Sequence, residues 1–194
     1  MAERTANPKL VIISGPSGVG KSTVVKDVLA ESSLPLALSV SATTRAPRPG
    51  EVDGADYHFL TRDEFARRKD AGEFLECKEV HGRGDWYGTL RKTVEDGLAA
   101  GSWVVLEIDV EGMKSVVERY PQAISIFIHL SSIDELERRL RKRNTETEVS
   151  LQRRLEAAAK ELACLSNYKY DVVNDQRDEA VRNVCEILLK ERGA

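Results

Sequence analysis

Residues 15–22 read GPSGVGKS and fill every fixed position of the phosphate-loop pattern G-x-x-x-x-G-K-[ST]. Upstream of the loop, the apolar and β-branched run at residues 10–13 predicts a short buried strand. Downstream, apolar residues at helical spacing predict a helix over residues 22–30. The glycines are therefore expected on a strand-to-helix turn, the context in which this pattern binds phosphate groups.

Each part of this loop is suited to holding a polyphosphate. Backbone N–H groups without neighbouring Cβ atoms approach phosphate oxygens closely, and the helix N-terminus adds partial positive charge. Lys21 would reach the β- and γ-phosphates, and the Ser22 hydroxyl would bind Mg²⁺. We expect a nucleoside triphosphate here, with hydrolysis, transfer and mere binding all open at this point. The expected contacts are Gly15, Pro16, Ser17, Gly18, Val19, Gly20, Lys21, Ser22 and Thr23.

Composition and charge narrow the class of protein. A chain of 194 residues suits one α/β domain, and its net charge of −3 favours neither nucleic acid nor a membrane surface as a partner. The three cysteines and three histidines show no disulfide or metal-ligand spacing, so we expect buried thiols in a reducing compartment. The first eight residues lack the apolar segment of a signal peptide. These features predict a cytoplasmic protein.

Short apolar runs alternate with helical patterns along much of the chain. The strand-like runs cover residues 10–14, 36–40, 103–108, 124–130 and 170–173. Because strands that alternate with helices form parallel sheets, we predict an α/β fold with a central parallel sheet flanked by helices. Thr61 with Glu64 and Ser132 with Glu135 predict two capped helix starts. A last helix is predicted over residues 178–190. Its core face would carry Val181, Val184, Cys185, Leu188 and Leu189.

Two segments interrupt this alternation. Between residues 40 and 103, strand-like pieces at 57–60 and 74–80 flank a charged helix at 62–71, which predicts an inserted α+β lobe. Residues 143–148 are polar and lie between predicted helices at 133–142 and 149–165. Arginines crowd both sides of this loop. They either form a solvated face with i,i+4 charge pairs or close over bound phosphates as a lid.

A second anion site is indicated by the turn that follows residue 40. Arg45 and Arg48 lie three residues apart in a turn that Pro47 and Pro49 stiffen. Two guanidinium groups in such a turn can clamp one phosphate group bidentately. A small phosphate ester is therefore the expected ligand, and a basic surface loop is the alternative.

Taken in order, the motifs resemble those of the guanylate kinase family. The segment 39–51, SVSATTRAPRPGE, together with Gly54, Asp56 and Tyr57, is similar to that family's nucleoside monophosphate signature. The similarity includes the phosphate loop and extends over nearly the whole chain. The other matching segments are residues 74–76 (FLE), 87–89 (YGT), 106–110 (LEIDV) with Gly112, 143 with 145–148, and 172–175 (VVND).

This resemblance implies a P-loop kinase fold and a set of site residues. Asn174 would lie beside the ATP adenine, and Ser22 would be the metal ligand. The residues implied for catalysis are Lys21, Arg45, Arg139, Arg143 and Arg154. The residues implied for binding GMP are Ser41, Arg45, Arg48, Tyr57, Glu76, Tyr87, Thr89 and Asp109.

Within the GMP set, four residues would hold the phosphate and four would contact the base. Guanine presents N1–H and a 2-amino group as donors, which carboxylates accept, and O6 as an acceptor, which a hydroxyl serves. Adenine reverses this pattern, and AMP would leave a buried carboxylate unpaired, so a large selectivity for GMP is expected. The base-contacting residues would be Ser41, Glu76, Thr89 and Asp109.

The resemblance also implies a domain organisation and a reaction. Residues 1–8 are expected to be a disordered tail, and residues 9–194 a single domain. Its parts would be a core (9–38, 102–132 and 168–194), a GMP-binding lobe (39–101) and a helical lid (133–167). The expected reaction is Mg²⁺-dependent transfer of the ATP γ-phosphoryl group to GMP, giving ADP and GDP. The expected ligands are ATP and GMP, with dGMP as well, for a monomer or weak homo-oligomer.

Three other functions compete with this one. A non-catalytic guanylate-kinase-like interaction module would have lost phosphate-loop residues that this chain keeps. A ribosyl phosphate kinase of the same fold would have no guanine for Ser41, Glu76, Thr89 and Asp109 to contact. A nucleic-acid-binding ATPase would need a basic excess and aromatic stacking motifs.

The chain also departs from the family's pattern at four places. The connection 81–86 is about two residues longer than usual, and Trp86 stands where a tyrosine is common. Glu111 replaces a usual glutamine, and Asn144 replaces a frequent glycine at the edge of the lid. Because asparagine tolerates left-handed backbone angles, the lid turn is expected to form.

Overall fold

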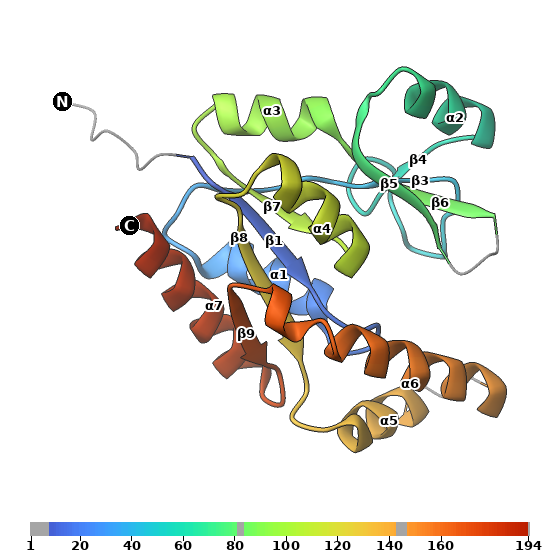
Figure 1. The fold of residues 1–194 in the computed structure, drawn as a ribbon, viewed down its shortest axis with the longest axis vertical. Helices are drawn as coiled ribbons and strands as arrows, with labels where there is room; N and C mark the ends of the chain where they lie inside the picture. Colours follow the sequence, from blue (N-terminus) through green and yellow to red (C-terminus); the bar gives the residue numbers. More distant parts are fainter. Residues whose placement is uncertain (1–7, 81–83, 143–146, 194) are drawn as a thin grey trace.

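A five-stranded parallel sheet forms the centre of the protein (Figure 1). The strand order is β2-β7-β1-β8-β9, and every neighbouring pair is parallel. The strands are β1 (Leu10–Ser14), β2 (Leu36–Leu38), β7 (Trp103–Glu107), β8 (Ile124–His129) and β9 (Tyr170–Val173). The computed structural model describes residues 8–80, 84–142 and 147–193. The predicted tail therefore lies outside the described residues apart from Pro8, and so does Arg143.

Both faces of this sheet are covered by helices because its strands are apolar on both sides. All five residues of β1 are buried; Val11 and Ile13 pack into one hydrophobic cluster, and Leu10 and Ile12 pack into the other. Helices α1 (Lys21–Glu31) and α7 (Arg177–Arg192) cover the first face. Helices α3 (Arg91–Ala99) and α4 (Val110–Arg119) cover the second. This arrangement confirms the predicted α/β fold.

A second, four-stranded sheet lies beside the core and carries helix α2 (Arg62–Asp70). Its order is β4-β3-β6-β5, with β3 (Ala42–Thr43), β4 (His58–Phe59), β5 (Phe74–Val80) and β6 (Asp85–Leu90). The pairs β3 with β6 and β5 with β6 are antiparallel, and β3 with β4 is parallel. The predicted change of architecture after residue 40 is therefore correct.

Helices α5 (Ile133–Lys142) and α6 (Glu148–Leu162) project together from the end of the core (Figure 1). Leu136 and Leu140 of α5 and Leu151 and Ala158 of α6 are buried in the first hydrophobic cluster. Thr147 caps α6 by accepting a hydrogen bond from the Ser150 N–H group. Most of the predicted loop at 143–148 lies outside the described residues, and α6 begins at Glu148 and ends at Leu162.

Several local predictions require correction. The strand predicted over 36–40 ends at Leu38, because the chain leaves the central sheet there for the second sheet. Leu189, placed on the core face of the last helix, is 46% exposed. Cys77, Cys164 and Cys185 are only partly buried, although all three are free thiols. Within the described residues, no helix is long and apolar enough to span a membrane.

Candidate functional site

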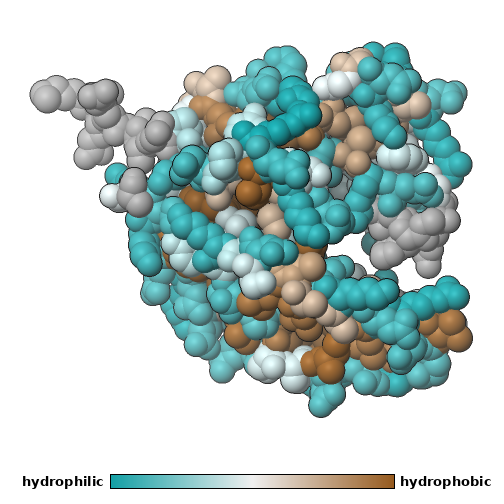
Figure 2. All heavy atoms as spheres, in the orientation of Figure 1, coloured by the Kyte–Doolittle hydropathy of each residue, from teal (hydrophilic) through white to brown (hydrophobic). Residues whose placement is uncertain are grey.

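A cavity of about 340 Å³ opens at the carboxyl ends of β1, β2 and β7, where ligands bind in open α/β sheets. The second sheet and α6 form its other walls, and Figure 2 shows the surface hollowed between them. One wall carries Gly15, Ser17 and Lys21 of the phosphate loop. The opposite walls carry Ser41, Tyr57, Glu76, Tyr87 and Asp109. Of the second predicted anion site, Arg45 and Arg48 are not among the described residues that line the cavity, but Arg45 donates to the hydroxyl of Tyr87, which does.

The phosphate loop has the backbone that its glycines predict. Gly15, Gly18 and Gly20 have positive φ angles of 143°, 97° and 94°, and Gly20 precedes the first residue of α1. The Lys21 ammonium group folds back over the loop and donates to the carbonyl oxygens of Gly15 at 2.5 Å and of Pro16 at 3.2 Å. Burial lowers the pKa of Lys21, and nearby carboxylates oppose that shift. A polyphosphate would bring negative charge into direct contact with this ammonium group, which here donates to carbonyl oxygens.

The Ser22 hydroxyl, at the start of α1, is exposed and donates to the Glu107 carboxylate at 2.7 Å. Among the described residues, no cluster of three His, Cys, Asp or Glu side chains could bind a metal ion. A single hydroxyl donor such as Ser22 fits Mg²⁺, because this ion usually keeps several waters and takes its other ligands from substrate phosphates. Ser22 would supply the protein oxygen.

Asn174 follows β9 and packs against the phosphate loop. Its side-chain Nδ2 donates to the Val19 carbonyl at 2.7 Å, and its backbone N–H donates to the His129 carbonyl at 2.7 Å. The residue is 4% exposed. A Cβ on Gly20 would lie 2.8 Å from this same Nδ2. Asn174 therefore ties the phosphate loop to the edge of the central sheet.

The Arg45 guanidinium group is held on three sides. It donates two hydrogen bonds of 2.9 Å to Glu51 and one of 3.1 Å to the Tyr87 hydroxyl, and it lies 5.4 Å from the centre of the Tyr57 ring. The hydrogen bonds to Glu51, followed by the one to Tyr87, raise the pKa of Arg45, and the hydrogen bonds from Arg45 and from the Arg48 N–H lower the pKa of Glu51 to about 2. The Arg48 side chain is exposed, while its N–H donates to Glu51 at 2.6 Å. Three of the four predicted phosphate contacts are therefore gathered in one cluster.

Glu76 lies on β5 and points into the cavity. The Thr89 hydroxyl donates to its Oε1 at 2.6 Å from the paired strand β6. Burial raises the pKa of Glu76, while the hydrogen bond from Thr89 opposes the shift. Thr89 is completely buried and is not among the described residues that line the cavity, unlike Ser41. Thr89 therefore orients Glu76 from behind.

Asp109 combines two contacts at the start of α4. It is the N-cap of that helix, and its Oδ1 accepts from the Gly112 N–H at 2.9 Å. Its Oδ2 forms an ion pair with the Lys78 ammonium group. A Cβ on Gly112 would lie 3.1 Å from Glu76 Oε2, so the two carboxylates approach each other across the first turn of α4. Asp109 therefore both caps α4 and lines the cavity.

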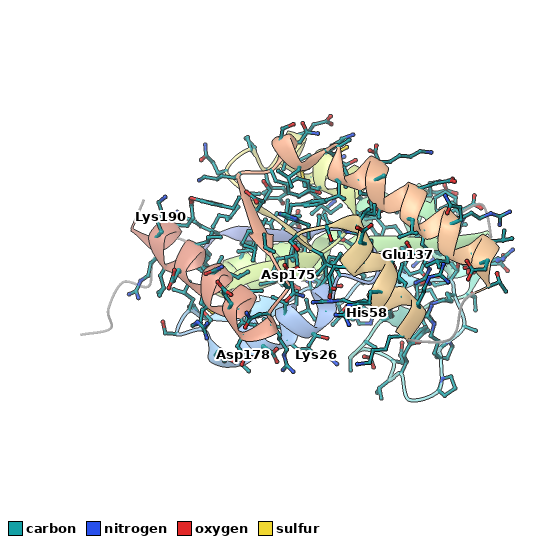
Figure 3. All side chains as sticks on the ribbon, turned by 90° about the horizontal axis from the view of Figure 1, so that it is seen from below. Lys26, His58, Glu137, Asp175, Asp178 and Lys190 are labelled. Atoms are coloured by element: carbon teal, nitrogen blue, oxygen red, sulfur yellow. The ribbon has the colours of Figure 1, made fainter. Side chains whose placement is uncertain are left out.

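Two of the predicted lid arginines lie in described helices. Arg139 of α5 donates to the Asp175 carbonyl and to Glu135, both at 2.9 Å. Arg138 pairs with the same Glu135 but is exposed. Figure 3 labels Asp175, which lies between α7 and α5, so Arg139 faces the turn that holds Asn174. Arg154 is partly buried on α6. Neither Arg139 nor Arg154 lines the cavity in this structure, among the residues described.

The family model of guanylate kinases matches residues 7–191, which is nearly the whole chain. The chain belongs to the guanylate kinase family. A guanylate kinase of Rhodopirellula baltica is 55% identical over 193 residues, covering 98% of this chain and 92% of that protein. A guanylate kinase of Bifidobacterium longum is 47% identical over 197 residues and covers all of both chains.

Solved structures give the same result for the fold. The crystal structure of guanylate kinase from Anaplasma phagocytophilum aligns with a TM-score of 0.78 at 34% identity, covering 97% of this chain and 87% of that chain. A shikimate kinase from Bacteroides thetaiotaomicron aligns with a TM-score of 0.53 at 17% identity, covering 93% and 98%. The second match shows only a shared fold, which confirms the P-loop kinase architecture.

Five polar residues of this guanylate kinase family member line the cavity without having been predicted as site residues: Ser39, Asp56, Lys78, Glu107 and Glu161. Lys78 follows Glu76 by two residues, so strand alternation was the available signal. Glu107 is the last residue of β7, and Ser39 directly follows β2, so both lie at the edge of the central sheet where ligands bind. No local pattern marks Glu161, because only the packing of α6 brings it to the cavity.

Replacing Asn174 by alanine should lower the free energy of unfolding by about 1–2 kcal/mol, because the buried Val19 carbonyl loses its donor. We also expect a raised KM for ATP, since the phosphate loop would no longer be tied to β9. Urea unfolding and initial-rate kinetics measure the two effects. An unchanged unfolding midpoint and an unchanged KM would contradict this role of Asn174.

Proposed function

We propose that this protein catalyses Mg²⁺-dependent transfer of the ATP γ-phosphoryl group to GMP, giving ADP and GDP. The observation that carries the proposal is a single cavity with the phosphate loop on one wall and Ser41, Glu76 and Asp109 on another. A donor phosphate and an acceptor nucleotide bound to these walls would meet inside it. Membership of the guanylate kinase family supports the same reaction.

On the donor side, residues 15–23 would bind the ATP phosphates and Asn174 would lie near the adenine. Lys21 would release the carbonyl oxygens of its own loop and donate to the β- and γ-phosphates instead. Arg139, Arg143 and Arg154 would approach the transferred group when α5 and α6 move toward it. Mg²⁺, bound by Ser22 and phosphate oxygens, would neutralise part of the charge that develops in the transition state.

On the acceptor side, Arg45, Arg48, Tyr57 and Tyr87 would hold the GMP phosphate. Arg45 and Tyr87 already contact each other, so part of this site is organised before the ligand binds. Glu51 keeps Arg45 in place through two parallel hydrogen bonds. The phosphate would bind to the second Nη2 hydrogen of Arg45, since Glu51, Ala46 and Tyr87 accept from the others, and to the two tyrosine hydroxyls.

The base would be selected by hydrogen-bond complementarity. Glu76 and Asp109 present carboxylate oxygens, which accept from guanine N1–H and the 2-amino group, and Ser41 offers a hydroxyl to O6. Thr89 would act through Glu76, whose orientation it fixes. Adenine would place its N1 acceptor and its C2–H opposite the two carboxylates, where guanine has donors, which is costly in a half-buried site.

The reaction needs no covalent nucleophile on the protein, since the GMP phosphate oxygen is already anionic. The protein would hold donor and acceptor in line and neutralise the charge that shifts between them. We propose that residues 39–101 act as the GMP-binding lobe and residues 133–167 as a lid that excludes water, which otherwise competes as acceptor. We also propose a cytoplasmic enzyme that uses dGMP as well and is a monomer or weak homo-oligomer.

The test is ADP formation from Mg-ATP by the purified protein with GMP, AMP, CMP, UMP or no acceptor. Turnover with GMP far above the others supports the proposal. GMP binding without any turnover would favour a non-catalytic interaction module. Turnover with ribosyl phosphates but not with GMP would favour the related sugar-phosphate kinase.

Replacing Glu76 by glutamine should lower kcat/KM for GMP by about 10²-fold, because an amide offers a donor where guanine also has donors. Selectivity for GMP over AMP should fall with it. Because burial raises the pKa of Glu76, kcat/KM of the wild type should decline as the pH falls through a value above the ordinary carboxyl range. This part of the acid limb should disappear in Glu76→Gln.

Glu79→Gln is the matched control, because Glu79 is an exposed glutamate on the opposite face of the same strand. Its kinetics should stay within about twofold of the wild type. If Glu76→Gln keeps the wild-type preference for GMP over AMP, the assignment of base selection to Glu76 is wrong.

A further inference from the structure

Lys78 places a cation at the acceptor end of the cavity. It lies on β5 two residues after Glu76, so the two side chains share one face of the strand. It pairs in register with Tyr87 of β6, another cavity residue. Its ammonium group forms an ion pair with Asp109 Oδ2 at the start of α4. Lys78 therefore bridges the second sheet and the core across the cavity.

Carboxylates face Lys78 from three different elements. Asp109, at the start of α4, is the ion-pair partner of Lys78. The positive charge of Lys78 also acts on Glu76, which lies on the same strand, and on Glu161, which lies on α6. The other titratable groups around the cavity are Asp56, Tyr57, Tyr87, Glu107 and Lys21. Among the described residues that line the cavity, Lys78 and Lys21 are the two cations, and Lys21 belongs to the phosphate loop.

Two carboxylates brought to one edge of a purine repel each other. In a half-buried site such a pair lowers its energy when one member takes up a proton, which turns an acceptor into a donor. Burial and the charge of Asp109 both raise the pKa of Glu76, and the charge of Lys78 opposes them. Guanine requires acceptors at this edge, so protonation here would weaken its binding.

We propose that Lys78 is a specificity-determining residue of the acceptor pocket, placed to keep Glu76 and Asp109 together as hydrogen-bond acceptors for one base edge. This inference rests on the proposed function. Each carboxylate oxygen has two lone pairs, so Asp109 Oδ2 accepts from Lys78 and from the base at the same time. Lys78 thus stays in place when the nucleotide binds and acts through the carboxylates rather than on the reacting phosphate.

The proposal predicts which nucleotide feature depends on Lys78. Guanine and hypoxanthine share N1–H and O6, but only guanine has the 2-amino group. A second carboxylate acceptor is needed to satisfy both the N1–H and the 2-amino hydrogens. Loss of Lys78 should therefore weaken GMP more than IMP, and more at low pH than at high pH.

The experiment compares Lys78→Met, Lys78→Arg and the wild type, with Lys92→Met as a control for an exposed lysine that pairs with Asp96 on α3. We would measure kcat and KM for GMP and IMP between about pH 5.5 and 9, a range that begins above the ordinary carboxyl pKa. Calorimetry gives the affinity for GMP without turnover, and thermal unfolding checks the fold of each variant.

For Lys78→Met we expect kcat/KM for GMP to fall about tenfold at pH 7, with a smaller fall for IMP and in kcat. Its acid limb should move to higher pH. Lys78→Arg should recover most of the loss, because the charge is kept. An unchanged affinity for GMP, or an equal loss for GMP and IMP at every pH, would overturn the proposal. Wild-type turnover with GMP tests the function separately, and the calorimetric comparison tests Lys78 whatever that turnover is.

Discussion

In the Lys21→Met variant, ADP formation from Mg-ATP and GMP falls at least about 10³-fold. Methionine matches the length of the lysine but offers neither charge nor hydrogen-bond donor. In the free protein the Lys21 ammonium group donates to the carbonyl oxygens of Gly15 and Pro16, above the loop that would hold the phosphates. Initial rates in a coupled assay at saturating ATP and GMP measure the effect on kcat.

The fold and the GMP site should survive this change. Burial disfavours the charged form of Lys21, which offsets the loss of its hydrogen bonds to the Gly15 and Pro16 carbonyl oxygens, so the thermal stability should change little. Lys26→Met is the matched control: Lys26 lies on the outer side of the same helix and is exposed, as Figure 3 shows. Its rate should stay within about twofold of the wild type. If Lys21→Met kept more than about a tenth of the wild-type kcat, Lys21 would not stabilise the transferred group.

The Gly15→Ala variant is expected to lose at least about 3 kcal/mol of unfolding free energy, together with its kinase activity. Gly15 has a φ of +143°, and a Cβ on it would lie 1.9 Å from the Ile128 carbonyl oxygen. Ile128 is a buried residue of strand β8 in the central sheet, and its backbone cannot move aside without breaking the sheet. Urea unfolding followed by circular dichroism measures the loss.

Gly101→Ala separates the steric clash from the cost of a positive φ. Gly101 has a φ of +85°, and a Cβ there would have no described atom within 4 Å. Alanine at this position should lower the free energy of unfolding by only about 1–2 kcal/mol, because the left-handed conformation is then the sole unfavourable contribution. Equal losses in the two variants would show that contact with β8 does not determine the need for glycine at residue 15.

The elements that could be predicted from the sequence are those whose own residues carry a strong pattern. Strand β1 was predicted from its apolar and β-branched run, and α5 from the capping pair Ser132 and Glu135. In the structure all five residues of β1 are buried, and so are two leucines of α5 at i and i+4. Strand β6 was missed: Gly88 lies in its middle, where a Cβ would approach Cys77 and Phe74 to 2.8 Å. Close approach of β5 selects glycine there, against its weak strand propensity. Strand β3 has only two residues, too few for any period.

The residues of the candidate site also differ in whether a local sequence pattern identifies them. The glycine loop, Arg45 and Glu76 lie in contiguous motifs whose chemistry is visible in the sequence, and the structure gathers them around one cavity or beside it. Glu161 could not be found, because its position depends on how α6 packs over the core. Thr89 was expected to touch the base, but it is buried behind Glu76. Which side of a strand faces the ligand is decided by the pairing of β5 with β6, a long-range contact.

The small hydrophobic cluster under the second sheet affects how the protein opens locally. Within the described residues, its fully buried members are Ala42, Phe65 and Phe74, whereas each face of the central sheet is covered by a much larger cluster. Regions with few buried apolar contacts unfold at a lower free energy than the rest of a domain. Backbone amides of β3 to β6 should therefore exchange their hydrogens with deuterium well before those of β1, β7 and β8. A nucleotide that joins Glu76 to Asp109 would slow this exchange, so the acceptor substrate would complete the fold of the lobe that binds it.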